Sequence, residues 1–317
     1  FTPCATNAGF VGPGAGFPIN FFQANPYGAR IPVTMMNDDG YSNYNSLQID
    51  FRQQLWHGLQ FDANYTWSHT LGVSTPNDWT GAFTQFTLRD LKHSYGPTLF
   101  DLRHVVHVGA TYDLPFGRGK QLLSGSSRAV DHIVGGWTVG TIMTYQTGFP
   151  VRLSTGFQTF NNLADSGVNL NGISREQLQN AVGVFRFPGT NRVSLINPNL
   201  LNTSTNASGA VIFNSADTSL LTPHTTPGQF APPLYIFGPH GFYDDISISK
   251  SFVITERWRF SLQTLLINAF NHPVFGQTTN WGIPTNIRGS NFATVNSQTN
   301  DPGGFGRQIE FRLNIHF

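Results

Sequence analysis

The sequence is poor in charge and in cysteine, and it has no long apolar run. Charged residues make up 11% of the 317 residues, whereas a soluble globular protein carries roughly 25%. The formal net charge is +1 and no basic stripe stands out, so the chain lacks the cations with which a nucleic-acid binder neutralises phosphates. Its single cysteine, Cys4, excludes an internal disulfide and a metal site built from cysteine pairs. Because no stretch of about 18 apolar residues occurs, any membrane span has to be built from strands.

Signatures of catalysis and of metal binding are missing as well. The sequence contains no HExxH, GxxxxGK[ST] or GxSxG pattern, and the glycine-rich GPGAGF at 12–17 is interpreted as a loop because no helical pattern follows it. His104 and His107 are three residues apart, which on a strand places them on opposite faces. We therefore expect neither an enzyme nor a bound cofactor or metal.

The sequence does contain many aromatic residues and long two-residue alternations. Aromatic side chains make up 14% of the chain, and seven segments alternate apolar with polar residues, as a strand with one apolar face does. Each is long compared with the about 5 to 6 residues usual for a strand in globular proteins, and about 9 to 11 residues span a bilayer. The segments are residues 46–55, 59–69, 104–114, 137–147, 245–252, 257–270 and 306–317.

The last of these segments runs to the final residue of the chain. In GRQIEFRLNIHF (306–317) the polar residues occupy one face of a strand and five apolar residues the other. The edge strand of a soluble sandwich would show the same period, so this segment alone leaves both interpretations open. The apolar residues are Ile309, Phe311, Leu313, Ile315 and Phe317.

The connections between the segments alternate in length. The long ones are residues 70–101, 148–243 and 271–305, and the shorter ones are residues 56–58, 115–136 and 253–256. Outer-membrane barrels have short periplasmic turns and long extracellular loops, whereas a soluble sandwich has no reason to sort loop length by end. The pattern predicts an all-β fold, an antiparallel transmembrane β-barrel segment of about 7–8 long strands with a periplasmic C-terminus.

In such a barrel the apolar faces of the strands meet lipid and the polar faces meet a watery lumen. Charged residues on the predicted lumen face are interpreted as structural, pairing across strands or contacting a plug, with substrate contact as the alternative. These residues are Asp50, Arg52, Asp62, Glu310 and Arg312.

The long connections are the expected recognition surface. Within the longest one, residues 173–182 (ISREQLQNAV) predict a short helix, because Ser174 and Gln177 have the spacing of a capping box. Aromatic residues of the long connections are candidate contacts for an unknown substrate, and no chemical class of substrate follows from them. The candidates are Trp79, Phe83, Phe86, Trp281 and Phe292.

Six stretches, in order along the chain, resemble the C-terminal half of the barrel of TonB-dependent outer-membrane receptors, and the Oar-like group in particular. The resemblance implies a barrel of about 22 strands that is filled by an N-terminal plug and coupled to the TonB complex through a periplasmic box. The stretches are FDLRH (100–104), YDLPFGRGK (112–120), GGW with TYQTGFPV (135–151), GFYDDISISKSF (241–252), NAFNHPVFG (268–276) and GRQIEFRLNIHF (306–317).

The same resemblance implies a location in the bacterial outer membrane and a set of partners. These are outer-membrane lipid, an extracellular substrate, the TonB complex through an N-terminal part not seen in this sequence, and the barrel-assembly machinery. The machinery would recognise the alternate apolar residues from Ile309 to Phe317. The chain begins at Phe1 with neither an initiator Met nor a signal region, so we interpret residues 1–40 as an extracellular loop or incoming segment and 41–317 as the C-terminal part of the barrel.

The leading hypothesis is therefore a fragment, without plug or TonB box, that provides the barrel wall and extracellular loops of a TonB-dependent receptor or transporter. A self-contained small outer-membrane barrel with a structural or adhesive role is the first alternative, with an eighth strand from residues 1–40. A secreted β-sandwich binding protein is the second.

Overall fold

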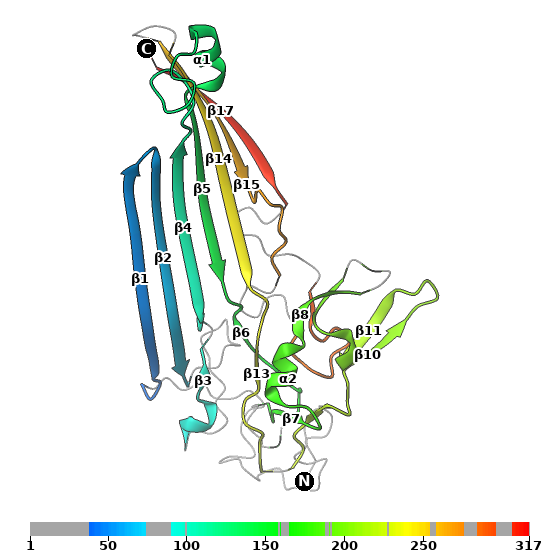
Figure 1. The fold of residues 1–317 in the computed structure, drawn as a ribbon. Helices are drawn as coiled ribbons and strands as arrows, with labels where there is room; N and C mark the ends of the chain where they lie inside the picture. Colours follow the sequence, from blue (N-terminus) through cyan, green and yellow to red (C-terminus); the bar gives the residue numbers. More distant parts are fainter. Residues whose placement is uncertain are drawn as a thin grey trace.

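The described protein has two parts, a long antiparallel sheet and a smaller strand-rich body at one end of it (Figure 1). The structure is a computed structural model. It describes residues 38–73, 90–98, 100–157, 159, 165–187, 190, 192–226, 228–253, 258–275, 284–295 and 306–316.

The sheet is built from the seven segments predicted from the alternation. Its strands follow one another in chain order, each antiparallel to the next, and the two-residue strand β3 (Gly96–Pro97) pairs with the end of β2. The predicted fold class is confirmed. The seven strands are β1 (Ser42–Trp56), β2 (Leu59–Gly72), β4 (His104–Asp113), β5 (Trp137–Gln146), β14 (Gly241–Val253), β15 (Arg259–Ile267) and β17 (Gln308–His316).

Among the described residues, β1 and β17 form the two edges of the sheet, each paired on one side only. Six antiparallel pairings separate them, so the two edge strands run in the same direction. An antiparallel closure of the sheet therefore requires an odd number of further strands between β17 and β1.

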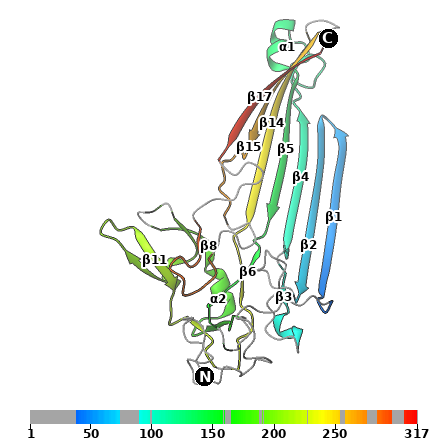
Figure 2. The ribbon, with the colours of Figure 1, turned by 180° about the vertical axis from the view of Figure 1, so that it is seen from behind.

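Short and long connections lie at opposite ends of the sheet, as the spacing predicts. The β1–β2 turn and the β4–β5 connection with helix α1 (Arg128–Val134) lie at one end, and the described parts of the long connections lie at the other (Figures 1 and 2). The β1–β2 turn consists of His57 (φ 51°) and Gly58 (φ 86°). Positive φ at both residues is the type I′ geometry that matches the twist of a tight hairpin.

The strand-rich body, here called the loop body, is formed by the described residues within 147–240 and by residues 284–295. Its short strands make small antiparallel sheets that include β6–β13, β7–β12, β10–β11 and β8–β9–β16. A 3₁₀ turn, η2 (Leu91–Ser94), precedes β3 outside this body. The elements of the loop body are β6 (Pro150–Arg152), β7 (Val168–Leu170), α2 (Arg175–Asn180), β8 (Val182–Arg186), β9 (Val193–Ile196), η3 (Pro198–Leu200), β10 (Leu201–Thr205), β11 (Val211–Ala216), β12 (Leu221–Pro223), β13 (Tyr235–Phe237) and β16 (Thr294–Val295).

Helix α2 confirms the short helix predicted within residues 173–182. Ser174 Oγ accepts from the backbone N–H of Gln177 at 3.0 Å, and the Gln177 side chain accepts from the Ser174 N–H at 2.8 Å. This capping box satisfies two backbone donors at the helix start. Leu178 on the inner side of α2 is fully buried.

The hydrophobic core of the described chain belongs to the loop body. Its buried cluster draws on β6 to β13, α2 and β16, with Leu178, Ile196 and Phe292 at 0% exposure. By contrast, no buried hydrophobic residue in the described ranges comes from the seven long strands. The sheet therefore has no protein core of its own on either face.

Candidate functional site

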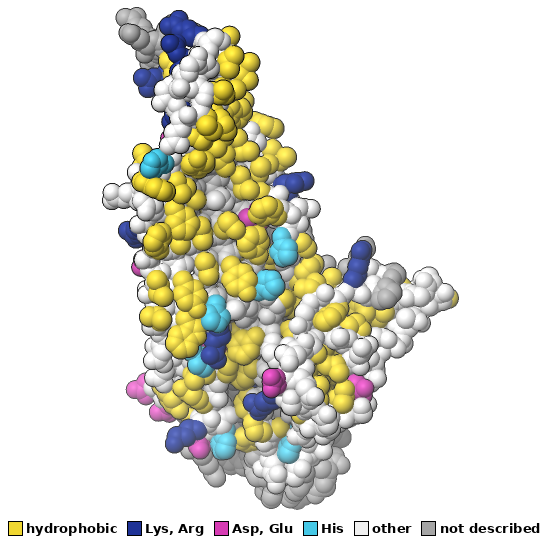
Figure 3. All heavy atoms as spheres, viewed as in Figure 1, with side chains coloured by type: hydrophobic (Ala, Val, Ile, Leu, Met, Phe, Trp, Pro, Cys, Tyr) yellow, Lys and Arg dark blue, Asp and Glu magenta, His cyan; other side chains and the backbone are white. Residues whose placement is uncertain are grey.

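The register of the sheet places most apolar side chains of the seven strands on one face. Side chains directly opposite each other in neighbouring strands point to the same side, and apolar pairs occur in every step from one edge of the sheet to the other. Hydrophobic side chains extend from end to end over the side of the sheet that Figure 3 shows. Pairs that define this apolar face are Ile49–Tyr65, Ala63–Val108, Val108–Met143, Val139–Ile248, Phe252–Phe260, Leu262–Leu313 and Leu266–Ile309.

The terminal strand β17 contributes four of the five predicted apolar residues to this face. Ile309, Phe311, Leu313 and Ile315 are all exposed, and Phe311 is the most exposed of them at 73%. Phe317 lies outside the described residues. Recognition of this strand by assembly machinery stays a prediction.

The opposite face carries the five predicted lumen charges. Asp50 accepts a hydrogen bond from Asn64 Nδ2 across the β1–β2 pair at 2.6 Å, and Arg52 lies opposite Asp62. Arg312 and Glu310 form an ion pair of 2.9 Å along β17. Both kinds of contact are exposed, so each stabilises the sheet by about 1 kcal/mol at most. The polar side chains of this face are exposed and bond to one another. Their position inside a barrel lumen stays a prediction.

Aromatic side chains mark both ends of the apolar face. At the loop-body end, the Tyr65 hydroxyl contacts His104 Nδ1 at 2.9 Å and the Tyr145 ring lies 5.5 Å from the ring of His240. At the other end, Trp258 stacks on Phe260 with 6.4 Å between ring centroids. Two such belts, separated by the length of the strands, are typical of the two headgroup levels of a membrane.

Lys250 is the one cation on the apolar face of β14. It lies between Trp137 and Leu262 in the register, yet its ammonium donates to the carbonyl oxygen of Gly135 at the C-cap of α1. The same ammonium lies 5.3 Å from the Trp137 ring and 5.1 Å from the Phe252 ring. Lys250 is only 3% exposed, so its charge is stabilised by the Gly135 carbonyl and the two aromatic rings.

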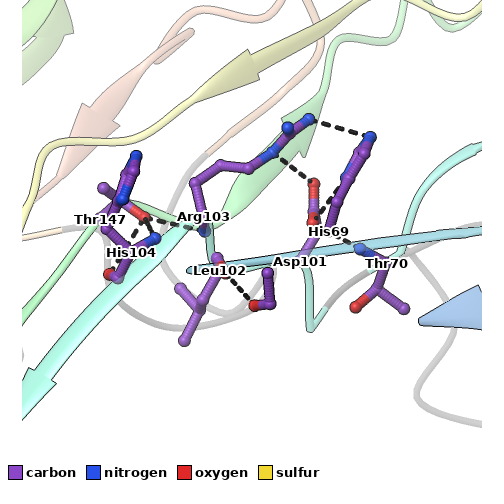
Figure 4. A network of polar contacts seen from close by, with 8 residues as sticks. His69, Thr70, Asp101, Leu102, Arg103, His104 and Thr147 are labelled. Atoms are coloured by element: carbon purple, nitrogen blue, oxygen red, sulfur yellow. Dashed lines mark hydrogen bonds and ion pairs between the residues drawn. The ribbon is translucent and has the colours of Figure 1, made fainter. Parts of the chain in front are cut away.

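A network around the fully buried Asp101 ties the loop-body end of the sheet together (Figure 4). Asp101 Oδ1 accepts from the backbone N–H of Thr70 at 2.7 Å and contacts His69 Nδ1 at 2.9 Å. Arg103 completes the group, with Nε 3.4 Å from Asp101 Oδ2 and a terminal nitrogen 3.0 Å from His69 Nε2. Because the arginine can only donate, His69 accepts at Nε2 and donates from Nδ1 to the carboxylate.

The same network reaches the loop body. The Arg103 guanidinium lies 5.8 Å from the centroid of the Phe237 ring in β13. Thr147 Oγ1, at the start of the loop body, accepts from the backbone N–H groups of Arg103 at 3.1 Å and His104 at 3.2 Å. This role of Asp101 and Arg103 was not predicted from the sequence, where FDLRH (100–104) served only as a mark of family resemblance. The available signal was an acid two residues before an arginine at the entry of a long strand.

Ionisable groups of the loop body interact with other groups of the same body. Arg152 in β6 pairs with Tyr235 in β13; burial lowers the pKa of the Arg152 guanidinium and raises the pKa of the Tyr235 phenol, which the charge of Arg152 partly offsets. Asp165 accepts from the backbone N–H groups of Thr155 and Gly156, both at 2.8 Å. A hydrogen bond from the Ser219 hydroxyl holds the pKa of Asp217 below its ordinary value.

The structure places one of the five predicted substrate contacts. Phe292 has 0% exposure and packs in the core of the loop body, so its ring offers no surface to a ligand in this conformation. The reason is that residues 284–295 return to the loop body and add β16 to β9. Trp79, Phe83, Phe86 and Trp281 lie outside the described residues, and their contact with a substrate stays a prediction.

Within the ranges that the structure describes, no group of three or more His, Cys, Asp or Glu side chains is arranged to hold a metal ion. No helix in these ranges combines the length and the hydropathy that crossing a membrane requires. The described residues form a sheet with one apolar face and one polar face, whose polar side chains bond to one another, and a folded body at one end of that sheet.

Comparison with known proteins identifies the family. The model of a family described as "Outer membrane beta barrel domain" matches residues 5–310. Neither the curated proteins nor the solved structures contain a significant match.

Proposed function

The chain belongs to the family of outer membrane beta barrel domains, and we propose that within such a barrel it forms the wall and extracellular loops of a TonB-dependent receptor. Membership implies the bacterial outer membrane as its location. The proposed role is uptake or surface recognition of an extracellular substrate, without catalysis by this chain. The C-terminus of β17 is proposed to lie in the periplasm.

One observation carries the proposal: a continuous apolar face on a sheet that has its described short connections at one end and the loop body, formed by long connections, at the other. Only a structure that crosses lipid with a fixed orientation has a reason to combine these two features. The loop body adds support, because a folded body with its own core can hold a binding surface in place. The six resembling stretches support the receptor family among outer-membrane barrels.

The membrane embedding is tested by cysteine labelling of neighbouring residues. In a Cys4→Ser background, single cysteines at Phe311 and Glu310 lie on opposite faces of one strand. We expect a water-soluble maleimide to label position 310 and to leave position 311 unreacted in the native protein in membranes, because 311 faces hydrocarbon. Equal labelling of both positions contradicts the proposal.

Orientation is tested on intact cells with a bulky, membrane-impermeant maleimide. A cysteine at Ser208, in the exposed tip between β10 and β11, should react, whereas a cysteine at Lys120, in the connection with α1, should react only after the outer membrane is opened. The reverse pattern would place the loop body in the periplasm and reject an extracellular recognition surface.

The receptor role itself is tested by sequencing the gene upstream of Phe1 and by measuring whether substrate uptake depends on TonB and the proton gradient. A reading frame upstream of Phe1 that encodes a plug and further strands supports the receptor. Uptake of a bound substrate by the complete protein should then stop when the TonB gene is deleted or the proton gradient is dissipated. Uptake that survives both treatments contradicts it.

A self-contained small barrel is the second candidate, and the strand directions are compatible with it. Because β1 and β17 run in the same direction, one further strand would complete an antiparallel barrel of about eight strands. In that case the chain alone should run as a compact, heat-modifiable monomer in detergent. A receptor fragment should fail to do so.

A further inference from the structure

The connection between β4 and β5, residues 114–136, is the feature that the proposed function leaves unexplained. It carries α1 and lies at the end of the sheet opposite the loop body (Figure 1). It is much longer than the two-residue β1–β2 turn at the same end, and a barrel hairpin does not need that length to reverse the chain. We call it the α1 connection.

Contacts hold the α1 connection on the apolar side of the sheet. The indole N–H of Trp137 donates to the carbonyl oxygen of Ile133 at 2.9 Å, and the ammonium of Lys250 donates to that of Gly135. Trp137 and Lys250 face each other on the apolar face. The backbone N–H of Ser251 bonds to Gly136 at 2.9 Å, where a Cβ would come within 2.6 Å of the Ser251 carbonyl. The end of α1 is therefore fixed beside the boundary of the lipid-facing surface.

The α1 connection has no core of fully buried side chains. Its two buried residues are glycines, Gly117 and Gly135, and no residue of α1 is buried. Ile133 is 71% exposed, more than most apolar residues of the strands. Its other exposed apolar side chains are Phe116, Leu122, Leu123 and Val130.

The charge of the α1 connection is positive where it is exposed. Arg118, Lys120 and Arg128 are exposed, and Lys and Arg side chains gather at this end of the molecule (Figure 3). The one acid, Asp131, turns inward and accepts from the backbone N–H of Arg118 at 2.6 Å. Exposed apolar residues beside exposed cations are typical of segments that lie in an anionic membrane interface.

We propose that the α1 connection is an interfacial lipid-binding element that inserts Ile133 and its neighbours into the periplasmic leaflet and binds anionic phospholipid headgroups through Arg118, Lys120 and Arg128. The occupant follows from continuity with the lipid-facing surface of an outer-membrane barrel and from the complementary charge. The inference deepens the expected partnership with lipid and does not depend on the receptor role.

The test uses the full chain with Cys4→Ser, reconstituted in vesicles, with one fluorophore at position 133. Brominated lipids quench a fluorophore that they contact, so brominated phosphatidylglycerol is compared with brominated phosphatidylcholine at equal mole fraction. We expect quenching by both lipids and a preference for phosphatidylglycerol. The double variant Lys120→Gln/Arg128→Gln should reduce that preference by about fivefold per cation removed.

Two controls make the outcomes decisive. A fluorophore at position 311 should be quenched by both lipids equally with or without the glutamine substitutions. The matched variant Arg175→Gln/Arg186→Gln removes two exposed cations of the loop body and should leave the preference at position 133 unchanged.

Each other result rejects a specific statement. Quenching at 311 without quenching at 133 means that the connection projects into water, which overturns the inference and leaves the barrel intact. Equal quenching at 133 by both lipids overturns the headgroup recognition. An absence of quenching at both positions rejects the membrane embedding on which the proposed function rests.

Discussion

The sheet and the loop body use apolar side chains in opposite ways. Phe311 in β17 is 73% exposed, whereas Phe292 beside β16 has 0% exposure, although the two phenylalanines are 19 residues apart in one chain. The loop body turns such residues inward and forms a core. The sheet turns them outward along the whole apolar face.

This difference shows which part of the protein needs its surroundings to fold. Full burial of a large apolar side chain stabilises a protein by about 1.5–3 kcal/mol. The loop body obtains this stabilisation from its own residues, but the sheet obtains it only when another apolar medium covers its exposed side chains. For an outer membrane barrel domain that medium is lipid.

The largest expected loss of stability is that of Phe292→Ala, with Phe311→Ala as its comparison. Phe292→Ala leaves a cavity in the core of the loop body and should lower its free energy of unfolding by about 3–5 kcal/mol in any solvent. Phe311→Ala should have no effect on the loop body. Limited proteolysis and hydrogen exchange of residues 147–240, measured in detergent for both variants, check this prediction; equal protection of the two would mean that the loop body has no independent core.

An arginine introduced on the apolar face of β1 should destabilise the protein much more than an arginine introduced on its polar face. Ile49 and Gln48 are neighbours near the middle of β1, on the apolar and the polar face respectively. Ile49→Arg should destabilise the protein in lipid vesicles by about 2–4 kcal/mol, because a guanidinium near the bilayer midplane is costly. Gln48→Arg should stay within about 0.5 kcal/mol. Urea unfolding from vesicles provides the measurement, and similar losses for both variants would contradict the assignment of faces.

The junction between the two regions depends on Asp101. Asp101→Ala removes the partner of His69 and Arg103 and leaves the Thr70 N–H without its acceptor, so it should cost about 1–3 kcal/mol. Faster hydrogen exchange of the Thr70 amide should report the loss. Asp90→Ala is the control, since Asp90 is exposed and caps only η2. If both variants lose the same amount of stability, the Asp101 network contributes no more than an exposed cap does.

Much of the sheet follows from the sequence because its determinants are local. Alternation and strand length predict all seven strands, and Ile142 is found on the polar face where its position in the alternation puts it, opposite Gly109 and Asp245. Connection lengths predict which end each loop occupies. A strand pattern of period two needs no knowledge of distant residues, because its faces are set by backbone geometry.

The loop body could not be predicted in the same way. Its core joins residues 151–236 to residues 284–295, across two strands of the sheet, and its strands of two to six residues are too short for a periodic signal. Phe292 therefore had the sequence features of a loop aromatic. The exception is α2, whose capping box is a local signal that survives in any context.

The caps of the two α-helices should differ in importance. Ser174→Ala breaks the reciprocal capping box of α2 and should cost about 1 kcal/mol. Ser127→Ala removes from α1 a single contact of 3.4 Å, and a few tenths of a kcal/mol is expected. Denaturation monitored at the loop body should respond to the first variant only. A larger effect of Ser127→Ala would mean that α1 is part of a folded core.

The smallest effect at neutral pH is expected for Tyr235→Phe. The phenol oxygen is buried and makes no hydrogen bond within the described part of the chain, so its removal should change stability by less than about 0.5 kcal/mol.

Wild type and Tyr235→Phe should differ in how their stability depends on pH in the alkaline range. Burial raises the pKa of Tyr235 in the folded protein, so its contribution is fully present below the unfolded-state pKa of about 10. The contribution is lost as pH rises through the higher native value. Wild type should therefore lose loop-body stability above about pH 10 more steeply than Tyr235→Phe, as measured by urea unfolding at a series of alkaline pH values. If stability falls with pH equally in wild type and in Tyr235→Phe, the Tyr235 phenol is in contact with water. The loop body would then exclude water less completely than its buried core indicates.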